Sequence, residues 1–196
     1  MVLGSLSHYE TILDLILSPY VGVYCWLCGC YKNCLNCMAK FLKEIKPMTD
    51  ISMELDEMLN QAISVAGNSP FAVVVSGGEP LLQPQVITYL RNAIDRINSL
   101  YGTDLFLQVY TGYNEDEIVG YDKTVLSCID VLIVGEYDEE NDDGFTPVVG
   151  SINQKLVFAT DREDLAKEYR RFMSTQCRKR KTIYSNHLNR FITVGV

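Results

Sequence analysis

Apolar residues recur along the chain at two spacings, which predict alternating helices and strands. Residues 52–66 follow the i, i+3, i+4, i+7 pattern of an amphipathic helix, which Ser52 can cap and Gly67 can end. A second stretch with this spacing starts at Pro84, a residue suited to the first turn of a helix, and runs to Ile97. Between them, residues 71–75 form a continuous apolar run rich in β-branched side chains, which indicates a strand buried on both faces.

Weaker patterns complete the expected order of elements. We expect further strands at residues 9–17, 21–27, 104–110, 130–134, 155–159 and 190–196, and further helices at 114–119 and 160–173. Strand and helix alternate at least four times, which indicates parallel strands joined by crossover helices. The expected fold class is α/β with mostly parallel strands, and the pattern alone does not say whether the sheet closes.

Composition indicates one globular domain over residues 1–196. The chain is 47% hydrophobic and 21% charged, which allows a sizeable core. No run approaches the ~18 apolar residues of a membrane span, and we see no secretory signal. Seven cysteines in a chain of this length suggest a reducing cytoplasm rather than a small disulfide scaffold. The net charge of −8 argues against broad nucleic-acid binding.

One basic run, Arg178-Lys-Arg-Lys181, stands against this acidic background. We interpret it as a solvated helix end or tail, with docking to an acidic partner surface or to nucleic acid as the alternatives.

The strongest chemical signal is a cluster of cysteines after the expected strand at residues 21–27. Cys30, Cys34 and Cys37 follow a C-x3-C-x2-C spacing. A cubic four-iron cluster normally takes one thiolate per iron, so three close cysteines suggest a cluster with one iron open to a ligand. Cys25 and Cys28 form a C-x2-C pair ahead of Cys34 and Cys37, which leaves a zinc site open as an alternative, although zinc ribbons usually separate their pairs by roughly 15 to 20 residues. Buried or disulfide-bonded thiols are a further alternative.

A second special loop, Ser76-Gly-Gly-Glu-Pro80, follows the buried strand at residues 71–75. Loops at the carboxyl ends of parallel strands gather the chemistry of such folds. Gly77 and Gly78 lack Cβ atoms, so a ligand can approach the main chain closely, and the Glu79 carboxylate suits an ammonium group. A plain strand-to-helix turn is the alternative explanation.

Together, these two loops resemble those of radical S-adenosylmethionine (SAM) enzymes. Three further segments, Tyr110-Thr-Gly-Tyr113, Asp130-Val-Leu-Ile-Val-Gly135 and Gly150-Ser-Ile-Asn-Gln154, are similar in order and spacing to the anaerobic ribonucleoside-triphosphate reductase activating protein family. The resemblance implies a partial (β/α) barrel of radical SAM type. It covers residues 14–154, so residues 160–196 form a C-terminal extension beyond the core that resembles the family.

The resemblance also implies an activity. It makes Cys30, Cys34 and Cys37 the ligands of a [4Fe-4S] cluster and places Gly77, Gly78 and Glu79 at SAM. Thr111 and Asn153 are further candidates for the SAM site, with an ordinary loop hydrogen bond as the alternative for each. The implied reaction is reductive SAM cleavage, with an electron from a flavodoxin-like donor, to place a glycyl radical on an anaerobic ribonucleotide reductase.

The chain departs from the family pattern in several places. Glu79 stands where the family usually has aspartate, Asn36 precedes the last cysteine where many radical SAM enzymes have an aromatic residue, and Cys25 and Cys28 lie outside the motif. Two other hypotheses therefore remain open. One is another small radical SAM enzyme, such as a different glycyl-radical activase or a relative of 7-carboxy-7-deazaguanine synthase, and the other is a non-catalytic zinc module.

Overall fold

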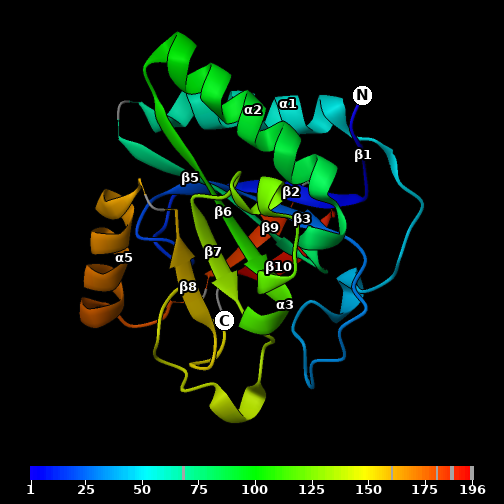
Figure 1. Cartoon of the computed structure of the whole chain (residues 1–196), viewed down its shortest axis with the longest axis vertical. Coiled ribbons are helices and arrows are strands. Elements are labelled where there is room, and N and C mark those ends of the chain that lie inside the picture. The colour runs from blue at the N-terminus through cyan, green and yellow to red at the C-terminus, as the bar shows by residue number, and fades with distance from the viewer. Residues whose placement is uncertain (68, 160, 180, 186–187, 195–196) are drawn as a thin grey trace.

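The computed structural model describes residues 1–67, 69–159, 161–179, 181–185 and 188–194. Figure 1 shows helices packed around a central sheet. The strands are β1 (Leu3–Gly4), β2 (Leu6–Ile12), β3 (Gly22–Leu27), β4 (Thr49–Asp50), β5 (Pro70–Gly77), β6 (Asp104–Thr111), β7 (Val131–Val134), β8 (Lys155–Phe158), β9 (Lys181–Ser185) and β10 (Arg190–Val194). The helices are α1 (Ser52–Ala66), α2 (Pro84–Tyr101), α3 (Glu115–Val119), α4 (Lys123–Leu126) and α5 (Glu163–Thr175).

The central sheet has six strands in the order β2-β3-β5-β6-β7-β8. Strands β3, β5, β6 and β7 are parallel, and the edge strands β2 and β8 pair antiparallel with their neighbours. The predicted α/β class with mostly parallel strands is confirmed. None of the described helices is long and apolar enough to cross a membrane.

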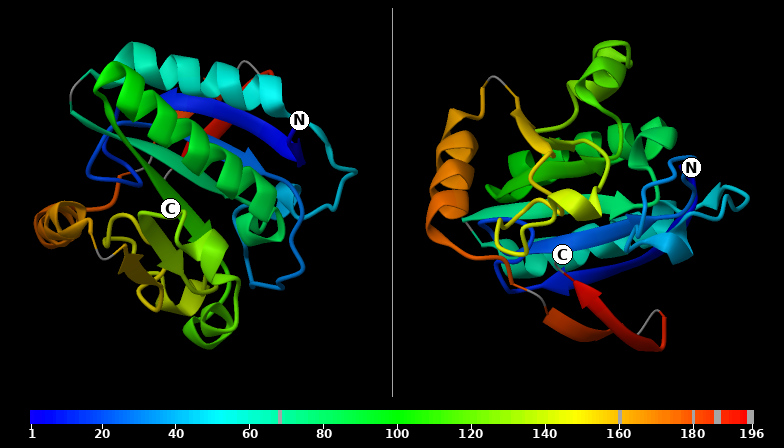
Figure 2. Two further views of the ribbon diagram at one scale, coloured as in Figure 1. Left: turned by 45° about the horizontal axis from the view of Figure 1, so that its top comes forward. Right: turned by 90° about the horizontal axis from the view of Figure 1, so that it is seen from below.

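The two faces of the sheet pack against different helices because successive strand residues point to opposite sides. On one face, Val73, Val75 and Leu107 join a core with residues of α1 and α2. On the other face, Val74 and Phe106 join a second core with residues of α5. Figure 2 shows α1 and α2 together over the sheet, with α5 along a different side.

Several predicted elements differ from the structure at their ends. Helix α1 has the predicted bounds and Gly67 as its C-cap residue, but its N-cap residue is Ile51. Ser52 is already helical, and its amide and hydroxyl both donate to Asp50 Oδ1. The first strand was predicted at residues 9–17; it is Leu6–Ile12, after which the chain leaves the sheet and buries Ile16 in the second core.

The C-terminal part differs more. The interpretation of the basic run as a solvated helix end or tail is wrong for Arg178, whose side chain is only 3% exposed and pairs with Asp142 and Asp143. Helix α5 ends before it at Thr175, and Lys181 begins strand β9, which the sequence patterns did not predict. Thr160, Arg180 and residues 195–196, which belong to predicted elements or to the basic run, lie outside the described residues.

Candidate active site

A cavity of about 530 Å³ lies at the carboxyl ends of the parallel strands. Its walls include loops that follow β3, β5, β6 and β7, together with residues of β10. Trp26 and Tyr110 line it and also pack against the second core, so the cavity lies on the face of the sheet opposite α1 and α2. The volume falls in the range typical of a site for one small ligand, about 300 to 1,000 Å³.

Cys30, Cys34 and Cys37 all line this cavity. Their loop is closed at its base, because the Gly29 and Cys30 amides donate to the carbonyl oxygens of Leu42 and Lys43. The three thiols are free and partly buried. Burial raises the pKa of Cys34 to about 11, and the nearby Glu136 carboxylate and other two cysteines add to the shift.

The three cysteines offer the donor chemistry of an iron–sulfur site, since clusters are held by thiolates. Over the described part of the chain, however, no three Cys, His, Asp or Glu side chains already converge closely enough to hold a metal ion. The loop between residues 31 and 39 has no helix or strand, so it can move the thiols toward a bound group without breaking regular structure. The donor set and its position in the cavity therefore fit a cluster.

Cys25 and Cys28 are placed differently. Cys25 is fully buried within β3, in the core shared with α1 and α2, and burial raises the pKa of its thiol to about 12. Cys28 is 3% exposed, and neither residue lines the cavity among the described residues. The two C-x2-C pairs therefore do not form a common zinc site, and the structure gives the zinc hypothesis no support.

Gly77 and Gly78 fix the distance between the cysteine loop and the loop after β5. Gly77 has φ +120°, and a Cβ atom there would collide with the Leu27 carbonyl oxygen. A Cβ atom on Gly78 would collide with the Gly29 carbonyl oxygen. The Gly78 amide donates to Leu27 at 2.8 Å and the Glu79 amide to Gly29 at 2.7 Å. The glycines thus allow two protein segments to approach each other, a role that neither of the two sequence interpretations, a ligand contact or a plain strand-to-helix turn, included.

Glu79 lies at the wall of the cavity with a carboxylate that is already hydrogen-bonded. The residue is 1% exposed, and its carboxylate accepts from the Leu81 amide at 3.0 Å, the Gly112 amide at 2.8 Å and the Thr111 hydroxyl at 2.8 Å. Burial raises the pKa of Glu79, although these three donors and Lys32 oppose the shift. Glu79 therefore joins the loop after β5 to the end of β6.

The structure separates the two weaker candidates. Thr111 lines the cavity and donates to Glu79. Asn153 is exposed, and its side chain donates to the Glu136 carbonyl oxygen at 2.9 Å. The neighbouring Gln154 lines the cavity and accepts from the Gly150 amide at 2.7 Å. Seven of the eight predicted site residues thus meet at one cavity, and Asn153 lies outside its described wall.

Sequence analysis missed Lys32, which lies between the first two cysteines of the motif. Its ammonium group contacts Glu117 at 2.7 Å and Glu136 at 3.0 Å, and it lies 5.1 Å from the Tyr113 ring centroid. Burial alone would lower the pKa of Lys32, but the two carboxylates raise it. These contacts fasten the cysteine loop to the loops after β6 and β7. No local pattern could identify them, because the partners are distant in sequence.

The C-terminal extension also reaches the cavity. Arg190, Phe191 and Thr193 of β10 are part of its wall, and the Arg190 guanidinium lies 4.7 Å from the centroid of the Phe41 ring. The sequence patterns did not place this extension at the cavity.

Comparison with known proteins agrees with the motifs. Residues 20–157 match the model of a family described as 4Fe-4S single cluster domain. The chain is also similar to the anaerobic ribonucleoside-triphosphate reductase-activating proteins of Salmonella typhi and Escherichia coli strain K12. Each is 24% identical over 148 residues, which is 75% of this chain and 94% of the relative. The family resemblance inferred from the sequence motifs is confirmed.

Proposed function

Because this chain belongs to the 4Fe-4S single cluster domain family, we propose that it is a radical SAM activase that places a glycyl radical on an anaerobic ribonucleotide reductase. The observation that carries the proposal is the cavity in which Cys30, Cys34 and Cys37 face the segment of Gly77, Gly78 and Glu79. The relatives named above supply the reductase as the partner class.

In the proposed site, the three cysteine thiolates hold a [4Fe-4S] cluster. Gly77 and Gly78 keep the loop after β5 against the cysteine loop, and Lys32 fastens that loop from the other side. A carboxylate has about four acceptor sites, of which three are used in Glu79, so roughly one remains for the SAM ammonium group. Asn153 stays a candidate only if its loop turns inward.

Cys30, Cys34 and Cys37 would hold the cluster, and Glu79 would hold SAM beside it. Bound there, a cluster reduced by one electron would supply the chemistry of reductive SAM cleavage to methionine and a 5′-deoxyadenosyl radical able to abstract hydrogen from a glycine of the partner. We propose a flavodoxin-like protein as the electron donor. All seven cysteines are free thiols, which supports our proposal that the protein acts in a reducing cytoplasm.

We also propose that the sheet is the wall of a partial (β/α) barrel of radical SAM type, with residues 1–196 as one domain. The four parallel strands and the cavity at their carboxyl ends support this arrangement. The extension after residue 160 would then be an addition to the barrel that helps to close its open side.

Electron paramagnetic resonance tests the proposed function. The reduced, SAM-loaded protein should produce a glycyl-radical doublet on the cognate anaerobic reductase, and Cys30→Ala should abolish it. SAM cleavage without a doublet, in the presence of a verified cognate reductase, would favour another radical SAM activity. Absence of SAM cleavage in protein with a complete cluster would overturn the proposal.

A further inference from the structure

The C-terminal hairpin of β9 and β10 stands apart from the central sheet. The two strands pair with each other and with no other described strand. Figure 2 shows the hairpin outside the six-stranded sheet. The outer edge of each strand therefore carries backbone donors and acceptors that no strand ladder uses over the described residues. Such an edge can template a further strand.

Strand β10 contributes three residues to the cavity wall. Neighbouring strand residues point to opposite faces of a sheet, yet Arg190 and Phe191 both line the cavity, followed by Thr193. Phe191 and Thr193 share one face of the strand and Arg190 lies on the other, an arrangement that lets the unpaired edge of β10 border the cavity. Phe191 is 72% exposed, so its ring is accessible to a segment that binds along this part of the wall.

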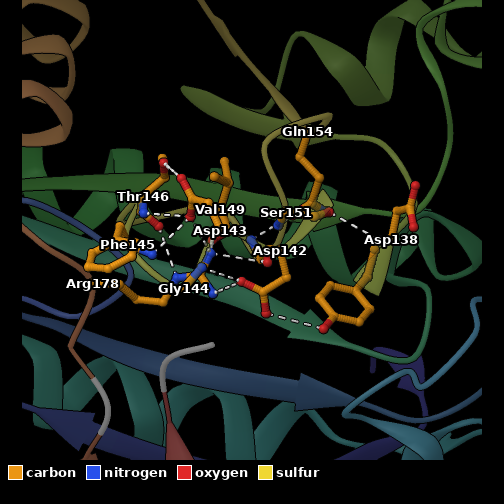
Figure 3. A network of polar contacts seen from close by, with 12 residues as sticks. Asp138, Asp142, Asp143, Gly144, Phe145, Thr146, Val149, Ser151, Gln154 and Arg178 are labelled. Atoms are coloured by element: carbon orange, nitrogen blue, oxygen red, sulfur yellow. Dashed lines mark hydrogen bonds and ion pairs between the residues drawn. The ribbon is translucent and has the colours of Figure 1, made fainter. Parts of the chain in front are cut away.

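The base of the hairpin is fixed to the loop that forms another part of the cavity wall. Figure 3 shows Arg178, three residues before β9, inserted among Asp142, Asp143 and the backbone of residues 146–150. Its guanidinium contacts Asp142 at 2.5 Å and donates to the carbonyl oxygens of Thr146, Val149 and Gly150 at 3.0–3.1 Å. Gly150 itself lines the cavity. The chain is thus anchored to this part of the cavity wall three residues before β9 begins.

The size of the cavity limits how a protein substrate can enter. About 530 Å³ is room for one small ligand, so a partner protein can reach it only with a narrow segment. The Arg190 guanidinium has five N–H donors and, in the described part of the chain, pairs with no carboxylate. It can therefore donate to the carbonyl oxygens of an extended backbone.

We propose that the edge of β10 receives an extended, glycine-bearing segment of the partner protein as an added strand. Backbone pairing would guide the segment to the cavity mouth, while Arg190 and Phe191 contact it on its two faces. The inference rests on the proposed function, which supplies the glycine-bearing partner, and it assigns the C-terminal extension to partner recognition.

Hydrogen exchange on the chain of residues 1–196, without cluster or SAM, gives a direct readout. The probe is a synthetic peptide that covers the radical-bearing glycine of the cognate reductase. Saturating peptide should slow amide exchange in β10 at least tenfold, with smaller changes in β2, an edge strand of the central sheet. Peptide binding that leaves β10 exchange unchanged, or no binding of the peptide at all, would overturn the inference.

Variants then connect docking to activity in the cluster-loaded protein. In Arg190→Gln and Phe191→Ala, the ratio of glycyl radical formed to SAM cleaved should fall at least tenfold at limiting reductase. Phe145→Ala is the matched control, because Phe145 is 70% exposed and does not line the cavity among described residues; its ratio should stay within twofold of wild type. An unchanged or increased ratio in both hairpin variants would overturn the inference, whereas loss of SAM cleavage in the wild type would count against the proposed function instead.

Discussion

Glu79→Gln removes a charge but preserves the shape of a buried side chain, so its effects on stability and on ligand binding can be separated. The Glu79 carboxylate accepts hydrogen bonds from Leu81, Thr111 and Gly112 at 2.8–3.0 Å. Glutamine can keep its oxygen toward Leu81 and Thr111, but its amide nitrogen then faces the Gly112 amide. Two donors would meet, and one hydrogen bond would be lost.

The magnitude follows from two opposing effects. Loss of a hydrogen bond to a charged group costs about 1.5 to 3 kcal/mol. Burial raises the pKa of Glu79, so removal of the charge recovers part of that cost. We expect the free energy of unfolding to fall by about 1 to 2 kcal/mol, which corresponds to a Tm lower by about 2 to 8 °C for a domain of this size.

The same substitution should also weaken the binding of SAM. If the remaining acceptor site of Glu79 meets the SAM ammonium, its loss should weaken SAM binding about tenfold to a hundredfold, since about 1.4 kcal/mol is a factor of ten. Circular dichroism on the metal-free protein measures Tm, and equilibrium titration of the cluster-loaded protein measures SAM affinity. Iron content should not change.

Asp130→Asn is a matched control for this experiment. Asp130 is a buried carboxylate that accepts from the Leu107 amide and pairs with Arg91, but it precedes β7 and therefore lies at the opposite end of the sheet from the cavity. It should lower Tm without changing SAM affinity. Unaltered SAM affinity in folded, cluster-loaded Glu79→Gln would refute the assigned contact, and an unaltered Tm would refute the hydrogen-bond argument.

Three further predictions concern stability and loop order. Cys25→Ala should cost about 1 kcal/mol as a small core deletion and leave iron and sulfide content unchanged by chemical analysis. Lys32→Met should speed amide exchange across residues 31–39, while the global free energy of unfolding changes by about 1 kcal/mol or less. Hydrogen bonds from Thr146 lower the pKa of Asp143 from 3.8 to about 2. The ionised Asp143 carboxylate therefore contributes to folding stability above about pH 4, and this contribution is lost as the pH falls toward 2. Asp143→Asn should remove that part of the pH dependence in urea unfolding.

Elements with strong local patterns could be predicted from the sequence. The periodic apolar residues of α1 and α2 set their buried faces, and the bounds of α1 agree. The helix predicted at residues 114–119 is α3, which begins with a local capping box formed by Asn114 and Glu117. The two special loops could be placed at one edge of the sheet because parallel strands end together.

Features that depend on distant partners could not be predicted. Strand β8 has the composition of any short strand, and only its pairing with β7 makes it antiparallel. The burial of Arg178 depends on Asp142 and the carbonyl groups of the loop that follows it, about 30 residues earlier in the chain. A run of basic residues carries no local signal that one of them will be buried.

Anaerobic reconstitution followed by a SAM cleavage assay tests the central claim most directly. Wild-type protein should bind close to four irons and four sulfides per chain and, with a chemical reductant, convert SAM to methionine and 5′-deoxyadenosine. Cys34→Ala should lose this cleavage, and Cys28→Ala, which changes a core thiol outside the described cavity wall, should keep it. Full cleavage by Cys34→Ala, or stoichiometric zinc with no iron uptake by the wild type, would contradict the account.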